Sequence, residues 1–140
     1  MKRRIYYQID GKNVPGLDRY SLRGYQPGVE SGFRAYLHHF LNKDDDGYHN
    51  HPWRIAFSLV LRGGYIESRI DTNTGIITYH KVRWLNILTN KHYHRIESIN
   101  PNTWTLFLVG PLSGKSWGFW IEGRGHVPFK QRYAERSLKL

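Results

Sequence analysis

The sequence predicts an antiparallel all-β fold. Short runs rich in Ile, Val, Thr, Tyr, Phe and Trp alternate with Gly and other turn residues at short intervals, which is the rhythm of a β-sandwich or barrel. The chain has 140 residues, enough for one hydrophobic core and too few for two. We therefore expect a single domain over residues 1–140, with its central part at about 33–128.

The expected strands follow the apolar runs in order. They cover residues 4–9, 33–41, 53–61, 65–70, 76–82, 104–109 and 117–121. Asp10-Gly11, Gly63-Gly64 and Asn73-Thr74-Gly75 are the expected turns, because these residue types tolerate positive φ. Residues 110–115 and 122–128 are expected to be loops.

Two segments need separate treatment. The apolar residues of 33–41 fit both a helical and a strand period, so periodicity leaves that segment open. Residues 129–140 are expected to form a short helix, since basic residues gather toward its end, where the helix dipole favours them.

Composition limits the function. With no cysteine, a bound metal must be held by nitrogen and oxygen donors. No apolar run approaches a membrane span, so we expect a soluble cytoplasmic protein with no membrane partner. The net charge of +10 suits a solvated basic surface better than a nucleic-acid site, because most of the basic residues are scattered.

The most informative motif is a His-x-His pair followed by a distant third histidine. His49 and His51 would point the same way on a strand, because successive side chains alternate faces, and His94 could complete a metal site. From His49 to Leu61 the odd positions carry nearly all the large apolar residues. We therefore expect the odd face to be the core face, with the two histidines at its end.

These residues resemble the cupin family. His49-Asn50-His51 followed by Gly63 is similar to the first cupin motif, and His94 before the 104–109 strand matches the histidine of the second. The segments at 36–40, 49–53, 61–67, 94–97 and 104–111 look like a poorly characterised group of small bacterial and phage cupins, over about residues 33–128. The resemblance implies an antiparallel double-stranded β-helix, the jelly-roll barrel.

The chain departs from the cupin pattern at one ligand. The glutamate usual after the second histidine would fall at Ile55 or Ala56, so a three-histidine site remains, similar to that of cysteine-dioxygenase-like cupins. Such a site leaves coordination positions open on a divalent ion. The resemblance implies Fe(II) first, with Zn, Ni or Mn as alternatives.

Additional ligands are open at three positions. Glu67 points outward if Gly63-Gly64 make a two-residue hairpin turn and inward if the loop has three residues. His92 would share a strand face with His94 and could supplement or replace it. His38 and His39 lie on opposite faces, and His39 is the candidate for the site.

Four aromatic residues are expected to line a pocket, although core packing is their commoner role: Trp53, Phe57, Tyr65 and Phe107. One of Arg54, Arg62, Arg69, Arg83 and Arg95, if directed inward, would bind the carboxylate or phosphate of a ligand.

Two functions follow as hypotheses. The first is a mononuclear non-haem metalloenzyme, dioxygenase-like, acting on a small anionic substrate. The second is a non-catalytic module that binds a nucleotide or sugar, because cupins serve many tasks. A nucleic-acid-associated protein is a weaker third. A homodimer formed through exposed strand edges is also expected.

Overall fold

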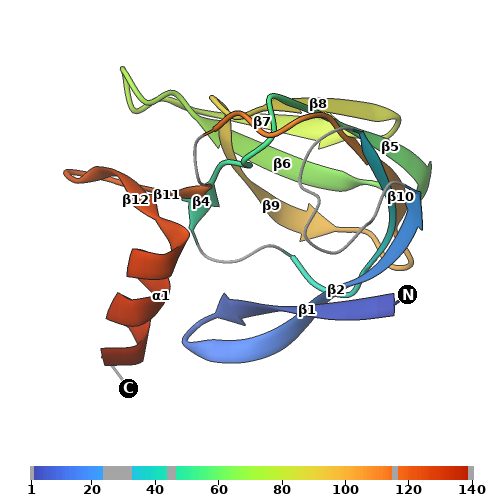
Figure 1. Cartoon of the computed structure of the whole chain (residues 1–140), viewed down its shortest axis with the longest axis horizontal. Coiled ribbons are helices and arrows are strands. Elements are labelled where there is room, and N and C mark those ends of the chain that lie inside the picture. Colours follow the sequence, from blue (N-terminus) through green and yellow to red (C-terminus); the bar gives the residue numbers. More distant parts are fainter. Residues whose placement is uncertain (1, 24–32, 44–46, 115–116, 139–140) are drawn as a thin grey trace.

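The computed structural model describes residues 2–23, 33–43, 47–114 and 117–138, and in them nearly all regular structure is antiparallel β. Two six-stranded sheets face each other and enclose the core (Figure 1). The first sheet has the order β1 (Lys2–Ile9), β2 (Lys12–Arg23), β3 (Arg34–Phe40), β10 (Trp104–Val109), β5 (Ile55–Arg62), β8 (Leu85–Thr89). The second has the order β12 (Gly125–Pro128), β11 (Gly118–Ile121), β4 (Tyr48–His49), β9 (Tyr93–Ile99), β6 (Tyr65–Ile70), β7 (Ile77–Val82).

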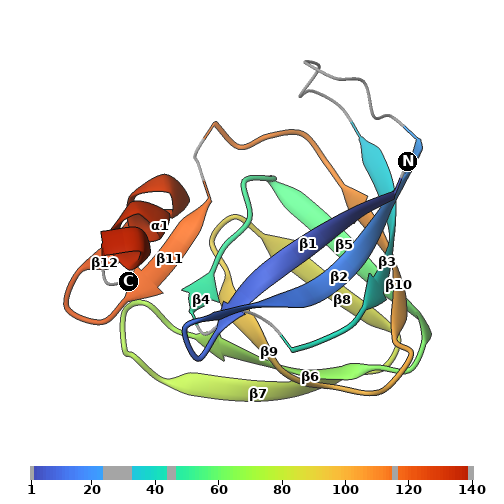
Figure 2. The same cartoon turned by 90° about the horizontal axis from the view of Figure 1, so that it is seen from below.

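The chain passes repeatedly from one sheet to the other, which gives the jelly-roll connectivity. β3 belongs to the first sheet and β4 to the second, and the same crossing recurs between β5 and β6 and between β9 and β10. Figure 2 shows β1, β2 and β3 on one side of the barrel and β6 with β7 on the other. The predicted all-β fold is therefore confirmed.

The expected strands agree with the structure over most of their length. β6 and β10 have the predicted bounds, and the ambiguous segment 33–41 forms strand β3. The Asp10-Gly11 turn is also present, with φ of 51° and 74°. Five strands of the described residues lie outside the expected ranges, β2, β4, β8, β9 and β12, and β12 corrects the loop expected at 122–128.

The Gly63-Gly64 hairpin is the first clear correction. β5 and β6 are not hydrogen-bonded neighbours, because they lie in different sheets. Gly63 has a φ of 80°, and a Cβ there would overlap the side chain of Thr103. The same threonine hydroxyl accepts a hydrogen bond from the Gly64 N–H at 3.1 Å. The two glycines therefore form a tight corner between the sheets, and hairpin register does not set the direction of Glu67.

The core face of β5 is the second correction. The even residues Ala56, Ser58 and Val60 are buried, whereas the odd residues Leu59 and Leu61 are 39% and 55% exposed. The alternation is broken before β5, because β4 ends at His49 and residues 50–54 lie outside both strands. A face assigned by counting from His49 is therefore inverted.

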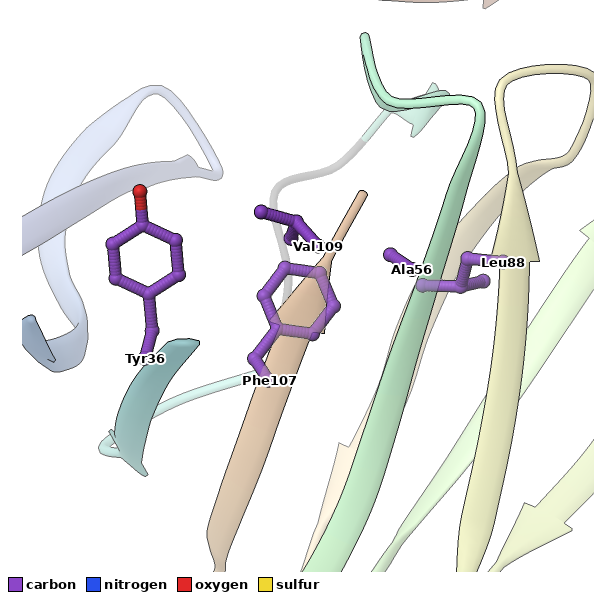
Figure 3. Close-up of a cluster of buried hydrophobic side chains, with 5 residues drawn as sticks. All are labelled: Tyr36, Ala56, Leu88, Phe107 and Val109. Atoms are coloured by element: carbon purple, nitrogen blue, oxygen red, sulfur yellow. The ribbon is translucent and has the colours of Figure 1, made fainter. Parts of the chain in front are cut away.

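Buried side chains on the inner face of the first sheet form one of the two hydrophobic clusters. It comprises Tyr36, Ala56, Leu88, Phe107 and Val109, contributed by β3, β5, β8 and β10 (Figure 3). Trp53 packs against this cluster from the segment that follows β4. The second cluster brings Val60 to Tyr65, Val82 and Ile96 of the opposite sheet.

The predicted C-terminal helix is present as α1 (Phe129–Leu138), and residues 139–140 lie outside the described part of the chain. It stands beside β11 and β12 at one side of the barrel (Figure 2). The Phe129 ring stacks on Trp117 with a centroid distance of 4.7 Å, and Tyr133 contacts Phe119 edge-on. Within the residues described, no helix is both long enough and apolar enough to span a bilayer.

Candidate metal centre

Three histidines converge between the two sheets. His49 on β4 is the direct cross-strand partner of His94 on β9. His51 follows two residues after His49, and one ring nitrogen from each of the three lies within 4.8 Å of the others. The predicted grouping of His49, His51 and His94 is therefore present in the structure.

The side chain of Asn50 explains how His51 reaches the group although it lies beyond the strand. Asn50 is buried, and its Oδ1 accepts a hydrogen bond from the Gly118 N–H at 2.8 Å. Its Nδ2 donates to the Asn90 carbonyl at 2.9 Å. The Asn50 N–H also donates to the Gly118 carbonyl, so the peptide between the two histidines is tied to β11. This anchoring directs both imidazoles to the same side.

The spacing of the imidazole nitrogens fits a single metal ion. Nε2 of His51 lies 2.9 Å from Nε2 of His94. Two nitrogens bound at right angles to one ion, each at 2.0–2.1 Å, would be about 2.9 Å apart. Nδ1 of His49 lies 3.3 Å from the Gly47 carbonyl, and one ring nitrogen of His49 lies within 4.8 Å of the ligand atoms of His51 and His94. The donor set therefore suits a divalent ion that accepts imidazole.

Burial favours the protonation state that a ligand needs. It lowers the pKa of His51 well below its ordinary value, and the neighbouring His94 and His49 lower it further. Neutral imidazole has a lone pair to give to a metal, whereas imidazolium has none.

Glu67 lies inward and fixes the ring of His94. Its side chain is fully buried, and Oε1 accepts a hydrogen bond from Nδ1 of His94 at 2.5 Å. Asn86 donates to the same oxygen at 2.9 Å, and Arg69 pairs with Oε2 at 2.9 Å. A carboxylate on Nδ1 keeps the proton there, so that Nε2 presents its lone pair toward His51.

The charge of Glu67 is stabilised by its partners. Burial by itself raises the pKa of this carboxyl, but the hydrogen bond from His94, the charge of Arg69 and the hydrogen bond from the Asn86 amide outweigh it and hold the pKa at about 2. Glu67 is therefore ionised over the physiological range. Glu67 therefore supports His94. Both of its carboxylate oxygens already accept hydrogen bonds, from His94 and Asn86 and from Arg69.

A chain of polar groups continues behind Glu67. Asn86 Nδ2 also donates to the Tyr65 hydroxyl at 3.1 Å, and that hydroxyl donates to Ser58 Oγ at 3.3 Å. Tyr65 was expected to line a pocket. It is a buried core residue, and it contacts the site through its hydrogen bond with Asn86.

Two of the other expected aromatic residues do lie beside the histidines. The Trp53 ring stacks on His51 with a centroid distance of 5.5 Å, and Phe107 contacts His51 at 6.0 Å. Phe57 is a correction. It belongs to the odd positions of β5, which form the outer face, and it pairs there with Leu108 and Ile87.

Two of the histidines considered as extra ligands lie elsewhere. Nδ1 of His92 accepts hydrogen bonds from Arg69 Nη1 and from the Thr89 N–H, each at 3.2 Å, and His92 is not part of the metal-ligand group. His39 stacks on Trp104 with a centroid distance of 4.2 Å, on the face opposite to buried His38. The choice of His39 was therefore wrong, and its neighbour points inward.

Arg19, which no sequence pattern indicated, contacts His38 on the inner face of the first sheet. The two residues are cross-strand partners on β2 and β3, and Arg19 Nε donates to His38 Nε2 at 2.9 Å. Among the arginines considered earlier, Arg69 points inward but is already paired with Glu67. Strand β2 itself was not predicted, so alternation could not be counted through Arg19.

Comparison with known proteins identifies the fold. No protein-family model matches the chain, and no curated protein matches it. The structure of the DMSP lyase DddQ from Ruegeria pomeroyi DSS-3 matches with a TM-score of 0.52 at 16% identity, over 79% of this chain and 55% of that one. Peruvianin-I, a cysteine peptidase from Thevetia peruviana latex, gives 0.52 at 11% identity, over 80% of this chain and 69% of that one.

The capsular polysaccharide assembling protein CapF from Staphylococcus aureus gives 0.50 at 11% identity, over 89% of this chain and 31% of that one. This chain thus spans about half the length of DddQ and about a third of CapF. At such identities the likeness shows the fold alone, and that fold is the cupin barrel. The activities of these proteins do not transfer with it.

Proposed function

We propose that this cupin-fold chain is a mononuclear metalloenzyme in which His49, His51 and His94 hold one divalent ion. The observation that carries the proposal is the 2.9 Å separation of the His51 and His94 Nε2 atoms, together with Glu67 on the other nitrogen of His94. Imidazole donors without thiolate suit Fe(II) and also Zn, Ni and Mn, and we favour Fe(II).

A bound ion with three protein ligands would supply open coordination positions and Lewis acidity for a small anionic substrate and a co-substrate such as oxygen. The residues of the chain prepare the site for this task. Glu67 holds His94 in the ligating tautomer. Trp53 and Phe107 cover His51 with apolar surface and limit water at that ligand. Dioxygenase-like chemistry is the activity we propose for this arrangement.

Metal analysis tests the ligand set. We expect about one ion per chain in the wild type, and less than about a tenth of that in His51→Ala and His94→Ala, because two imidazoles bind a divalent ion far more weakly than three. His80→Ala is the matched control, since His80 is exposed on β7. Equal metal content in all four proteins would overturn the site.

A binding module without catalysis is the second candidate, and one observation favours it. Within the described residues, the carboxylate nearest the histidines is Glu67, and its hydrogen bonds to His94, Asn86 and Arg69 leave it no free role as a general base. Oxygen uptake by Fe(II)-loaded protein with a panel of thiols and small carboxylic acids separates the two functions. Substrate-dependent uptake supports the enzyme, whereas binding without uptake across the panel supports the module.

A further inference from the structure

Arg19 is a cation held in place on the inner side of the first sheet. Its Nε donates to His38 Nε2 at 2.9 Å, and its guanidinium carbon lies 4.7 Å from the centre of the Tyr36 ring. These two contacts fix the plane of the guanidinium. They use only one of its five N–H donors, so the outer nitrogens stay available.

No carboxylate of the described residues pairs with Arg19. Its neighbour in sequence, Asp18, points to the opposite face, where Arg4 binds both of its oxygens at 2.8 and 3.1 Å. Lys2 adds a third contact to Asp18 at 3.3 Å. The adjacent negative charge is therefore fully used and does not neutralise Arg19.

Arg19 stands close to the metal centre. The ring of Phe107 lies between the two regions, with its centroid 5.1 Å from that of His38 and 6.0 Å from that of His51. One aromatic ring thus separates the fixed cation from a metal ligand.

Arg19 is half-buried. A partly desolvated cation without a counter-ion is costly, and a ligand that brings an anion to it reduces that cost. Burial lowers the pKa of Arg19, which shows the cost, but a guanidinium keeps its proton in proteins. Its flat pair of outer nitrogens matches a carboxylate or phosphate through two parallel hydrogen bonds.

We propose that Arg19, held by His38 and Tyr36, binds the anionic group of the substrate, a carboxylate or phosphate whose other end reaches the metal. This inference rests on the proposed metal site and names the substrate class that the site accepts. His38 is a positioning residue here, because its neutral ring accepts the hydrogen bond from Arg19 Nε and so fixes the orientation of the two outer guanidinium nitrogens.

The test measures anion binding to the Zn(II)-loaded protein through the imidazole NMR signals of His38 and His51. Glycolate and inorganic phosphate are the two anionic probes, and ethylene glycol is the neutral one. We expect Arg19→Gln to weaken the preferred anion about ten- to hundredfold, the range for a charged hydrogen bond, and to leave the weak diol response unchanged. Arg19→Lys should retain part of the anion affinity, because lysine keeps the positive charge but lacks the planar pair of N–H donors.

The matched control is Arg83→Gln, since Arg83 is exposed outside the site. Equal anion affinity in the wild type, Arg19→Gln and Arg83→Gln would overturn the proposal, as would an equal response to the diol and both anions. Metal content, measured on the same samples, separates the two ideas. Normal metal with no Arg19-dependent anion binding overturns the anion site alone. Anion binding that needs Arg19 in protein that takes up no metal supports the anion site and overturns the metal site.

Discussion

His94 and His38 are both buried, and both project into the space between the sheets, yet opposite charges control their rings. His94 on β9 has a carboxylate beside it, Glu67, which can only accept a hydrogen bond. The proton therefore stays on Nδ1, and Nε2, which faces Nε2 of His51 at 2.9 Å, carries the lone pair that can bind a metal. His38 on β3 has a guanidinium beside it, Arg19, which can only donate.

The donor beside His38 reverses its role. Its Nε2 must accept from Arg19, and burial together with the charge of Arg19 lowers the pKa of His38 well below its ordinary value. The His38 ring is neutral, and its acceptor nitrogen is occupied by the hydrogen bond from Arg19. His38 therefore supports the guanidinium of Arg19 and does not present a lone pair to a metal ion. The sign of the neighbouring charge therefore distinguishes the two buried histidines more clearly than burial does.

The largest expected effect comes from removing the ring that supports Arg19. His38→Ala should lower the free energy of unfolding by about 2–4 kcal/mol, because it leaves a cavity beside Phe40 and Phe107 and removes the acceptor of Arg19. Urea denaturation measures the change. Its neighbour His39, on the outer face against Trp104, is the matched control, and His39→Ala should cost less than about 1 kcal/mol. Equal losses would contradict the inward placement of His38, and metal content should stay at the wild-type level in both.

The next effect concerns the carboxylate that supports His94. Glu67→Gln should weaken metal binding about ten- to hundredfold, as expected when the group behind a ligating histidine is changed. Competition with a chelator of known affinity measures it. Glu97→Gln is the matched control, because Glu97 pairs with Ser68 and Arg95 away from the histidines. A similar affinity in both variants would show that Glu67 does not tune the ligand.

Local patterns were enough to predict part of this molecule. The alternation of β-rich runs and turn residues predicted the fold class and placed β6 and β10 correctly, and the His-x-His spacing brought His49 and His51 together with His94. The strand pattern depends on residues near each other in sequence, whereas the grouping with the distant His94 was expected from the resemblance to the two cupin motifs.

The errors arose where long-range contacts override local counting. Asn50 is tied to β11 and to Asn90, and residues 50–54 leave the strand, so the buried face of β5 is the reverse of the predicted one. Strand β2 contains Pro15, Gly16 and several charged residues, a composition that disfavours strand prediction. Arg19 was missed with it, although His38, its partner, had been considered.

A smaller effect is expected deeper in the network behind His94. Tyr65→Phe removes the hydroxyl that joins Asn86 to Ser58, so the free energy of unfolding should fall by about 0.5–1.5 kcal/mol. Metal affinity should change by less than about threefold, because Asn86 still donates to Glu67. Thermal unfolding and chelator competition measure the two quantities. A loss of affinity as large as that of Glu67→Gln would mean that the whole chain of hydrogen bonds holds His94.

The smallest expected effect concerns the ion pair between Arg4 and Asp18, which keeps the Asp18 carboxylate away from Arg19. Hydrogen bonds from Arg4 lower the pKa of Asp18 to about 2, with further help from Lys2. Because the folded-state pKa lies below the ordinary value of 3.8, the ionised pair stabilises the β1–β2 hairpin fully above about pH 4, and this stabilisation is lost as the pH falls toward 2. The effect is small since Arg4 and Lys2 are solvent-exposed and screened. We therefore expect the urea unfolding midpoint to fall less steeply for Asp18→Asn than for the wild type as the pH is lowered from 6 to 2. Parallel curves for the two proteins would show that the ion pair contributes nothing to the stability of the hairpin.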